Sequence, residues 1–212
     1  MPTLSSERRR FLERATLQYQ DHLDDAATYL EGRGIDLDFA KGVGLGVVRN
    51  PEALHAEYEG RLAIPYLTDR GPVHMAFRCI RDHDCKMTGC PKILRPKGWG
   101  NRLYGVQSLK VADDWIAVAE GEIDALTLQM VGIPAVGVPG AEVFKDHWPN
   151  VFEDFSRVYM YADGDKAGSD MISKWRDRIE TAVISAKMPD DEDVNSMFLK
   201  KGADFLIGKI RK

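Results

Sequence analysis

The chain has 212 residues and a formal net charge of -4, with 44% hydrophobic and 29% charged residues, which is ordinary for a globular protein of one large domain or two small ones. Its longest apolar stretches, such as residues 115–119, are far too short to span a bilayer, which excludes a transmembrane helix. The charge is divided unevenly, because residues 61–110 carry a balance of +7 and residues 111–212 a balance of -7. A basic block can neutralise phosphates and an acidic block can collect divalent cations, although either can also be a solvated surface.

The N-terminus and the cysteines indicate the cell compartment. Three arginines stand at residues 8–10, but FLERATLQYQ follows them, where a signal peptide needs an apolar core. The 3 cysteines are odd in number and all lie within residues 79–90, which does not make a disulfide framework. We therefore expect a reducing cytoplasm, and no membrane among the partners.

The first half of the chain predicts helices followed by a hairpin. Apolar residues recur at helical spacing over residues 6–31 and predict a helix there, with DDAATYLEGRG as a second helical stretch at its end. The chain becomes extended near residues 44–48, and residues 61–80 read as a β-hairpin around the turn-forming residues 69–72. Residues 82–104 are rich in Asp, Lys, Gly and Pro and predict a surface loop.

Short strands alternate with helices from residue 115 onward. The predicted strands are WIAVAE, AVGVPG, RVYMYADGD and AVISAKMP, and the predicted helices are EIDALTLQMVG, AGSDMISKWRDRIE and DVNSMFLKKGADFLIGKI. This alternation predicts a mixed α/β fold, a parallel sheet flanked by helices, with ligands at the carboxyl ends of the strands. Because SLKVADD reads as coil, we expect a smaller basic α+β subdomain over residues 1–110 and an α/β domain over residues 111–212.

Acidic residues follow three of these strands. Glu120 ends the first strand, and Asp124 lies one turn into the next helix. The third strand runs into Asp163 and Asp165, whose side chains point the same way if the strand direction persists. The fourth strand runs into four consecutive acids, which are Asp190, Asp191, Glu192 and Asp193. Up to five or six carboxylates are therefore expected to converge at one edge of the sheet.

A cluster of carboxylates needs a counter-charge, and the usual one is Mg²⁺ or Mn²⁺. Two such ions can stabilise the attacking and leaving oxygens of an in-line phosphoryl or nucleotidyl transfer. The alternative is that each acid only caps a helix or forms a turn. For a single Asp that alternative is favoured, but three successive acidic strand ends favour a metal site.

The acidic segments AVAEGEIDALTL, YADGDKAG and MPDDEDVNSMFLKKG resemble the three motifs of the TOPRIM fold, which also occurs in topoisomerases, nucleases and recombination proteins. The first half of the chain is more specific. YLEGRGIDLDFAKGVGLGVV, RLAIPYLTDRG, FRCI, CPKIL and RLYGV resemble, in the same order, segments of the RNA-polymerase core of bacterial-type DNA primases. The similarity extends over about residues 20–205.

The resemblance implies that the chain makes RNA primers on a single-stranded DNA template from NTPs, with Mg²⁺ or Mn²⁺ as cofactor and a replicative helicase as a candidate partner. The implied catalytic residues are Glu120, Asp124, Asp163 and Asp165, and the implied metal ligands are Glu120, Asp163, Asp165, Asp190 and Asp193. The implied nucleic-acid and nucleotide-binding residues are Arg61, Arg78, Lys92 and Lys97.

The sequence also departs from the family pattern. The amino-terminal zinc-binding domain and the helicase or helicase-binding domain of the family are not found, and Asp191 stands where glycine is usual. Such a short version resembles a phage or mobile-element primase, which would act in the cytoplasm of a bacterial host.

One further cluster is Cys79, His83, Cys85 and Cys90, in an Asp- and Lys-rich loop. Three thiols and an imidazole can make a tetrahedral zinc site. The spacing lacks a C-x₂-C knuckle, and Cys79 is expected in a strand where it can simply pack. Both states stay open, and reduced thiols without a metal are the favoured one.

Two other functions remain open beside primer synthesis. A TOPRIM nuclease would cut phosphodiester bonds with the same metals, and a non-catalytic adaptor would bind DNA or a helicase through the basic residues. A nuclease shortens a single-stranded substrate, whereas a primase lengthens a product on it.

Overall fold

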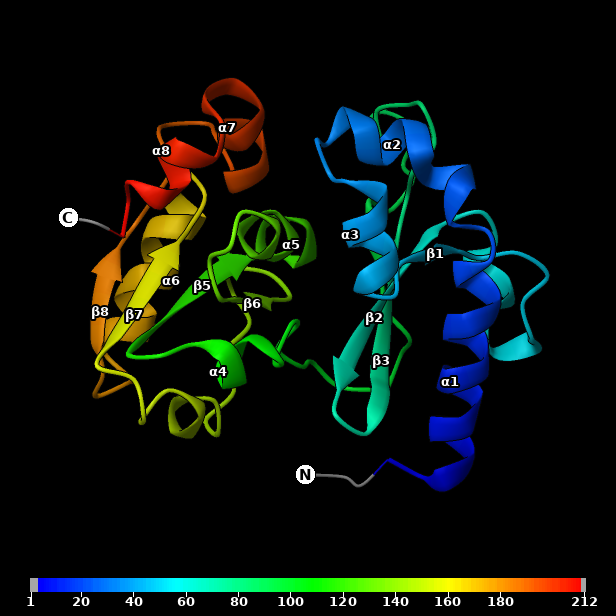
Figure 1. The fold of residues 1–212 in the computed structure, drawn as a ribbon, viewed down its shortest axis with the longest axis horizontal. Helices are drawn as coiled ribbons and strands as arrows, with labels where there is room; N and C mark the ends of the chain where they lie inside the picture. The colour runs from blue at the N-terminus through cyan, green and yellow to red at the C-terminus, as the bar shows by residue number, and fades with distance from the viewer. Residues whose placement is uncertain (1–3, 211–212) are drawn as a thin grey trace. The chain divides into compact units, whose positions relative to one another are not determined.

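The computed structural model describes residues 4–210 and separates into two units, which we call the N-terminal unit (residues 1–100) and the C-terminal unit (residues 101–212) (Figure 1). Within the described part of the chain, no helix is long and apolar enough to cross a membrane. Each unit has its own sheet and its own buried core.

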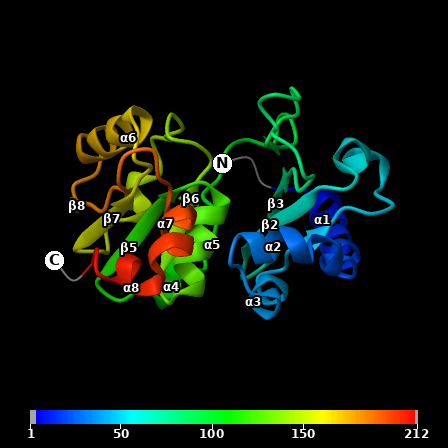
Figure 2. The same ribbon diagram turned by 90° about the horizontal axis from the view of Figure 1, so that it is seen from above.

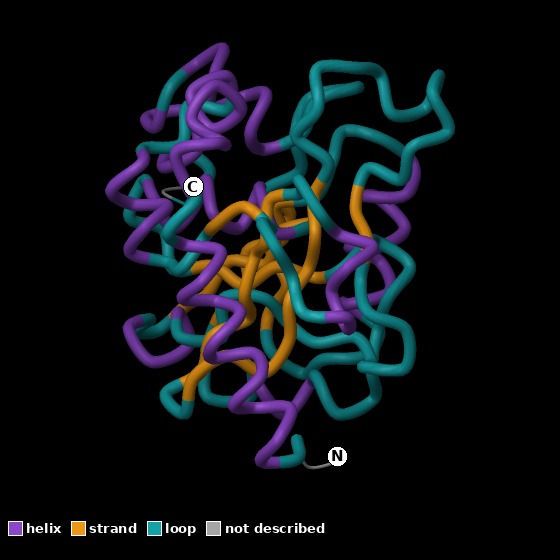
Figure 3. Tube along the Cα trace, turned by 90° about the vertical axis from the view of Figure 1, so that its right-hand side faces the viewer, coloured by secondary structure: helices purple, strands orange, loops and turns teal. Residues whose placement is uncertain are grey.

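The N-terminal unit is a four-stranded antiparallel sheet covered by helix α1. Its elements are α1 (Ser6–Gln20), η1 (Leu23–Ala26), α2 (Ala27–Gly32), α3 (Leu37–Gly42), β1 (Gly46–Val47), η2 (Ala53–Tyr58), β2 (Leu62–Thr68), β3 (Gly71–Arg78) and β4 (Ile93–Leu94), with strand order β1-β2-β3-β4. Phe11, Leu12 and Tyr19 of α1 are buried against Met75 and Phe77 of β3. Figure 3 shows this helix, which leads from the N-terminus, lying over the strands.

The predicted hairpin is confirmed, and so is a second helical stretch at residues 24–34, which contains α2, but the first helix ends at Gln20 and does not reach residue 31. The chain turns after Gln20 and continues as η1 and α2. Tertiary packing explains the break, because β1 passes directly over the end of α1. A Cβ added at Gly46 would lie only 2.2 Å from the carbonyl carbon of Tyr19. The loop predicted over residues 82–104 also contains a short strand, β4, which pairs with Phe77 and Arg78.

The C-terminal unit is a parallel sheet between two layers of helices, as the sequence predicts. Its elements are α4 (Ser108–Val111), β5 (Trp115–Glu120), α5 (Glu122–Met130), β6 (Ala135–Val138), η3 (Pro149–Val151), β7 (Arg157–Tyr161), α6 (Lys166–Arg176), β8 (Ala182–Ser185), α7 (Val194–Lys201) and α8 (Ala203–Ile207), with strand order β6-β5-β7-β8. Two predictions are wrong in detail. SLKVADD contains helix α4 instead of being coil, and the last helix is divided at Gly202, whose φ is 74°.

Alternation along the strands assigns the two faces of this sheet. Ile116, Val118 and Met160 pack with Trp175 of α6 in the larger core. On the opposite face, the Tyr161 hydroxyl donates a hydrogen bond of 2.8 Å to a carbonyl of α8. Figure 2 shows α6 on one side of the strands and α5, α7 and α8 on the other. The parallel direction brings the carboxyl ends of the strands, and the acidic residues after them, to one edge.

Candidate metal site

Asp163 is the most perturbed carboxyl group of the C-terminal unit. It lies two residues beyond the end of β7 and is half-buried. Burial raises its pKa to about 8, and the negative charges of four neighbours add to this shift. Those neighbours are Asp124, Glu120, Asp193 and Asp165. The buried Oδ1 atom of Asp163 has no hydrogen-bond partner.

Glu120, at the end of β5, is perturbed in the same direction. Burial is the largest cause of its raised pKa, the charge of Asp165 adds to it, and a hydrogen bond from the Ala141 backbone opposes it. Its Oε2 atom is buried and has no hydrogen-bond partner. Two buried carboxylate oxygens without donors, among further negative charges, fit the Mg²⁺ or Mn²⁺ that the sequence resemblance implies.

Asp165 and Asp193 cap helices as well as contributing negative charge. The Asp165 carboxylate accepts a hydrogen bond of 2.8 Å from the Gly168 backbone and caps α6. The Asp193 carboxylate accepts one of 2.6 Å from the Ser196 backbone and caps α7. Asp165 and Asp193 therefore do cap helices, which was the alternative interpretation of these acidic residues. Capping does not remove their charge, which still raises the pKa of Asp163.

Asp124 joins two helices beside this cluster. Its Oδ1 atom accepts a hydrogen bond of 3.0 Å from the backbone of Asn195. The Asn195 side-chain amide in turn donates a hydrogen bond of 3.0 Å to the Thr127 hydroxyl. Both Asp124 and Asn195 are buried. Asn195 is a residue of this site that the sequence did not predict. The signal was a polar residue at the start of a helix that directly follows the third acidic segment.

Asp190 is the acidic residue that the structure leaves outside the cluster. It is exposed, and it is not among the charges that raise the pKa of Asp163. The turn that follows brings the chain back to the second acidic motif, because the Gly164 backbone N–H donates 2.8 Å to the carbonyl of Glu192. The Glu192 side chain binds Ser196 and Lys200 and takes no part in the cluster.

Asp191 occupies the left-handed backbone region, with φ of 62°. This agrees with the expectation that glycine is usual at this position, and Asp tolerates the conformation better than most residues. We expect Asp191→Ala to lower the free energy of unfolding by about 1 kcal/mol, and Asp191→Gly to stay within about 0.5 kcal/mol of the wild type. Urea unfolding of both variants tests this, and an alanine variant as stable as the parent would contradict it.

The raised pKa of Asp163 predicts how the stability of the metal-free protein depends on pH. In the unfolded chain this carboxyl ionises near its ordinary value of 3.8, but in the folded chain only near 8. The contribution of Asp163 to stability is therefore full below about pH 4 and is lost as the pH rises toward about 8. With a chelator present, the difference in melting temperature between wild type and Asp163→Asn isolates this contribution and should change in this direction. A difference that is flat over this pH range would contradict the assignment.

The basic residues expected to bind nucleic acid belong to the N-terminal unit. Arg78 and Lys92 line a pocket of about 520 Å³, and the Arg78 guanidinium lies 5.9 Å from the ring centre of Tyr29. Arg61 holds the adjoining loop by donating 2.9 Å to the Pro91 carbonyl and 3.4 Å to the Cys90 sulfur. Lys97 is exposed and does not line this pocket.

The fold and the acidic edge agree with a known class. A family model described as the Toprim domain matches residues 115–204, which include both Glu120 and Asp163. The C-terminal unit is therefore a TOPRIM domain.

The relatives extend the assignment beyond that domain. The Gene 57 protein of Mycobacterium phage D29 is 37% identical over 153 residues, which are 72% of this chain and 99% of that protein. The DNA primase of Listeria innocua is 22% identical over 196 residues, which are 87% of this chain and 31% of that protein. The chain thus spans about a third of the length of the bacterial primases that it matches.

Solved structures show the same fold over almost the whole chain. The RNA polymerase domain of Mycobacterium tuberculosis primase DnaG, in complex with double-stranded DNA, aligns with a TM-score of 0.78 and 20% identity, covering 98% of this chain and 81% of that one. A DnaG primase catalytic domain bound to single-stranded DNA aligns with a TM-score of 0.75 and 18% identity, covering 98% and 80%. The chain belongs to the phage-type TOPRIM primase family, which confirms the resemblance found in the sequence.

Proposed function

We propose that the protein synthesises short RNA primers on single-stranded DNA by metal-dependent nucleotidyl transfer. The observation that carries the proposal is the Asp163 cluster, whose buried and unpartnered carboxylate oxygens sit at the strand edge of a primase-type TOPRIM domain. The structural relatives support DNA as the template, because related primase domains have been solved with single-stranded and double-stranded DNA.

In the proposed reaction, the 3′-hydroxyl of the growing primer attacks the α-phosphorus of an NTP. A new phosphodiester forms, the bond to the β-phosphate breaks, pyrophosphate leaves, and the hydroxyl proton passes to a base. Asp163, Asp165 and Asp193 would hold the cation, and the exposed Asp190 lies outside this cluster. When bound, Mg²⁺ or Mn²⁺ supplies charge stabilisation for the attacking and leaving oxygens. Glu120 would act either as a further ligand or as the base, and its raised pKa suits the second role.

A second cavity, of about 410 Å³, suits the phosphates of the incoming NTP. Ala141 lines it, and the backbone N–H of Ala141 donates to Glu120, which places this cavity beside the acidic edge. Lys166 and Lys174 also line it, together with Glu142 and Asp170, and the Lys174 ammonium donates a hydrogen bond of 2.7 Å to the Glu142 carbonyl. We propose that the two ammonium groups contact the triphosphate. Arg78 and Lys92, in the basic pocket of the N-terminal unit, are proposed to contact the template.

The test is a priming assay with the full chain, circular single-stranded DNA, labelled NTPs and either Mg²⁺ or Mn²⁺. Labelled oligonucleotides that disappear when the template or the metal is omitted support the proposal. A labelled linear substrate in a parallel reaction distinguishes the nuclease, which would shorten it. Absence of any product with both metals, together with DNA binding that carboxylate substitutions leave unchanged, would favour the adaptor instead.

A further inference from the structure

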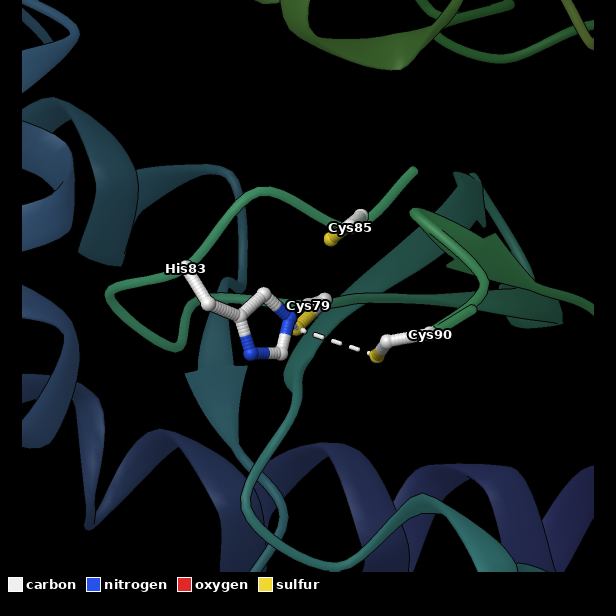
Figure 4. Close-up of side chains that lie close together, drawn as sticks. All are labelled: Cys79, His83, Cys85 and Cys90. Atoms are coloured by element: carbon white, nitrogen blue, oxygen red, sulfur yellow. Dashed lines mark hydrogen bonds between the residues drawn. The ribbon is translucent and has the colours of Figure 1, made fainter. Parts of the chain in front are cut away.

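The loop that follows β3 gathers four potential metal ligands in the N-terminal unit. The Sγ, Nε2 or Nδ1 ligand atoms of Cys79, His83, Cys85 and Cys90 all lie within 4.8 Å of one another. Figure 4 shows the four side chains converging from successive parts of the loop. Among residues 4–210, no other group of three or more such side chains meets this distance. The acidic edge of the C-terminal unit is therefore a looser arrangement than this cluster.

The spacing of the cluster is close to that of a zinc tetrahedron. The Cys79 and Cys90 sulfurs lie 3.6 Å apart, and the Cys79 sulfur lies 3.5 Å from Nε2 of His83. Zinc bonds of ordinary length imply edges of about 3.8 Å between sulfurs and about 3.6 Å between sulfur and nitrogen. These two edges are already formed. The remaining side chains have to close by no more than about 1 Å to complete a tetrahedron around the metal.

The backbone holds the two ends of the loop in register for such a site. The Cys79 N–H donates 3.0 Å to the carbonyl of Lys92, across the β3–β4 pair. The Arg61 side chain reaches from the start of β2 and fixes the other end, through the Pro91 carbonyl and the Cys90 sulfur. Cys79 directly follows β3 and Cys90 lies three residues before β4, so the strand pair and Arg61 hold both of these ligands in place.

Charge in the cluster also favours a cation. The Arg61 guanidinium lies 3.4 Å from the Cys90 sulfur, so a positive charge stands beside the thiols. Zinc binding releases the thiol protons and leaves three thiolates around the cation. Zn²⁺ with three thiolates and one imidazole carries a net charge of about -1, which the Arg61 guanidinium offsets.

We infer that Cys79, His83, Cys85 and Cys90 bind one structural Zn²⁺. All four positions of the tetrahedron are protein ligands, so the site is closed and has no place for a substrate. The bound zinc would fix the loop in position against the end of β3. That loop carries part of the basic lining of the 520 Å³ pocket, which includes Arg33, Arg78, Arg81, Lys86 and Lys92. The sequence spacing favoured unliganded thiols, and it is the three-dimensional convergence that reverses this preference.

The first test is the metal content of the full chain, purified under reducing conditions with zinc in the growth medium. We expect about one zinc per chain. Cys85→Ser should weaken zinc binding by more than the roughly 10–100-fold that loss of an outer partner costs, while the matched control His22→Ala keeps the metal. Cys85 is chosen because it is only half-buried. Wild-type protein without zinc, or a Cys85→Ser variant with undiminished zinc, would overturn the inference.

A second measurement keeps the inference testable if Cys85→Ser fails to fold. Cobalt added to the reduced, metal-free wild-type chain should give the d–d absorption of tetrahedral, thiolate-bound Co²⁺, and zinc should displace it. The absence of this spectrum, or a Cys79–Cys90 disulfide that forms in the presence of zinc, would contradict the site. Neither measurement depends on primer synthesis, so the zinc site and the proposed function can fail separately.

Discussion

Asp163→Asn is expected to abolish metal-dependent primer synthesis, with a loss of about 10³-fold in rate. The substitution keeps the shape of the side chain and removes the negative charge at the centre of the cluster. The Oδ1 atom of Asp163, which has no hydrogen-bond partner, is the atom proposed to bind the cation. An amide is a far poorer partner for Mg²⁺ than a carboxylate, so binding and catalysis should both fall.

The fold should survive this change for a physical reason. With its pKa near 8, the Asp163 carboxyl of the metal-free protein is mostly neutral at pH 7. Asparagine therefore resembles the state that the metal-free fold already prefers. We expect the melting temperature of Asp163→Asn without metal to equal or exceed that of the wild type. This separates a loss of chemistry from a loss of structure.

The matched control is Asp154→Asn, which removes a charge from an exposed loop of the same unit. Its priming rate should stay within about twofold of the wild type, because an exposed carboxylate away from the site contributes little. Mn²⁺ binding measured by calorimetry gives a second comparison, with weakened binding expected for Asp163→Asn alone. If Asp163→Asn retains activity within about tenfold of the control, the proposed centre of the site is wrong.

The sequence predicted the parts of this site that depend on local pattern. Short apolar strands alternating with amphipathic helices define a parallel sheet, and in such a sheet acids after successive strands must approach one edge. Glu120 and Asp163 follow from that rule alone, and the structure places both within electrostatic reach of Asp165. The rule predicts that an acidic residue lies at a strand end. It does not predict which carboxylate oxygens accept a hydrogen bond in the folded protein. Asp165, Asp193 and Asp190 have different surroundings for that reason.

Features that depend on tertiary approach could not be predicted. The break after Gln20 arises where β1 crosses the end of α1, and nothing in the local helical pattern marks it. The Cys79–Cys90 proximity arises because β4 brings the chain back beside β3. Asn195 acts through a hydrogen bond to Asp124, 71 residues earlier. In each case the cause is a contact between segments that are distant in sequence or joined by an irregular loop.

The second acidic motif and the third are held together by such a contact at Gly164. A Cβ added there would lie 1.7 Å from the carbonyl oxygen of Pro189 and 3.0 Å from Cα of Asp190. The same glycine donates 2.8 Å to the Glu192 carbonyl, and its own carbonyl accepts 3.4 Å from the Asp191 backbone. The atoms that a side chain would meet are backbone atoms, so no rotamer change can make room for it.

We therefore expect Gly164→Ala to separate the two motifs, with a loss of about 3 kcal/mol in the free energy of unfolding. Asp163 and Asp193 would move apart, so Mn²⁺ affinity should fall together with stability. The control is Gly32→Ala at the end of α2, where an added Cβ has nothing within 4 Å. That variant should be as stable as the wild type or more so. Urea unfolding and Mn²⁺ calorimetry of both variants test this prediction. A Gly164→Ala protein with the stability and the Mn²⁺ affinity of the wild type would mean that the backbone contact at Gly164 does not hold the acidic edge together.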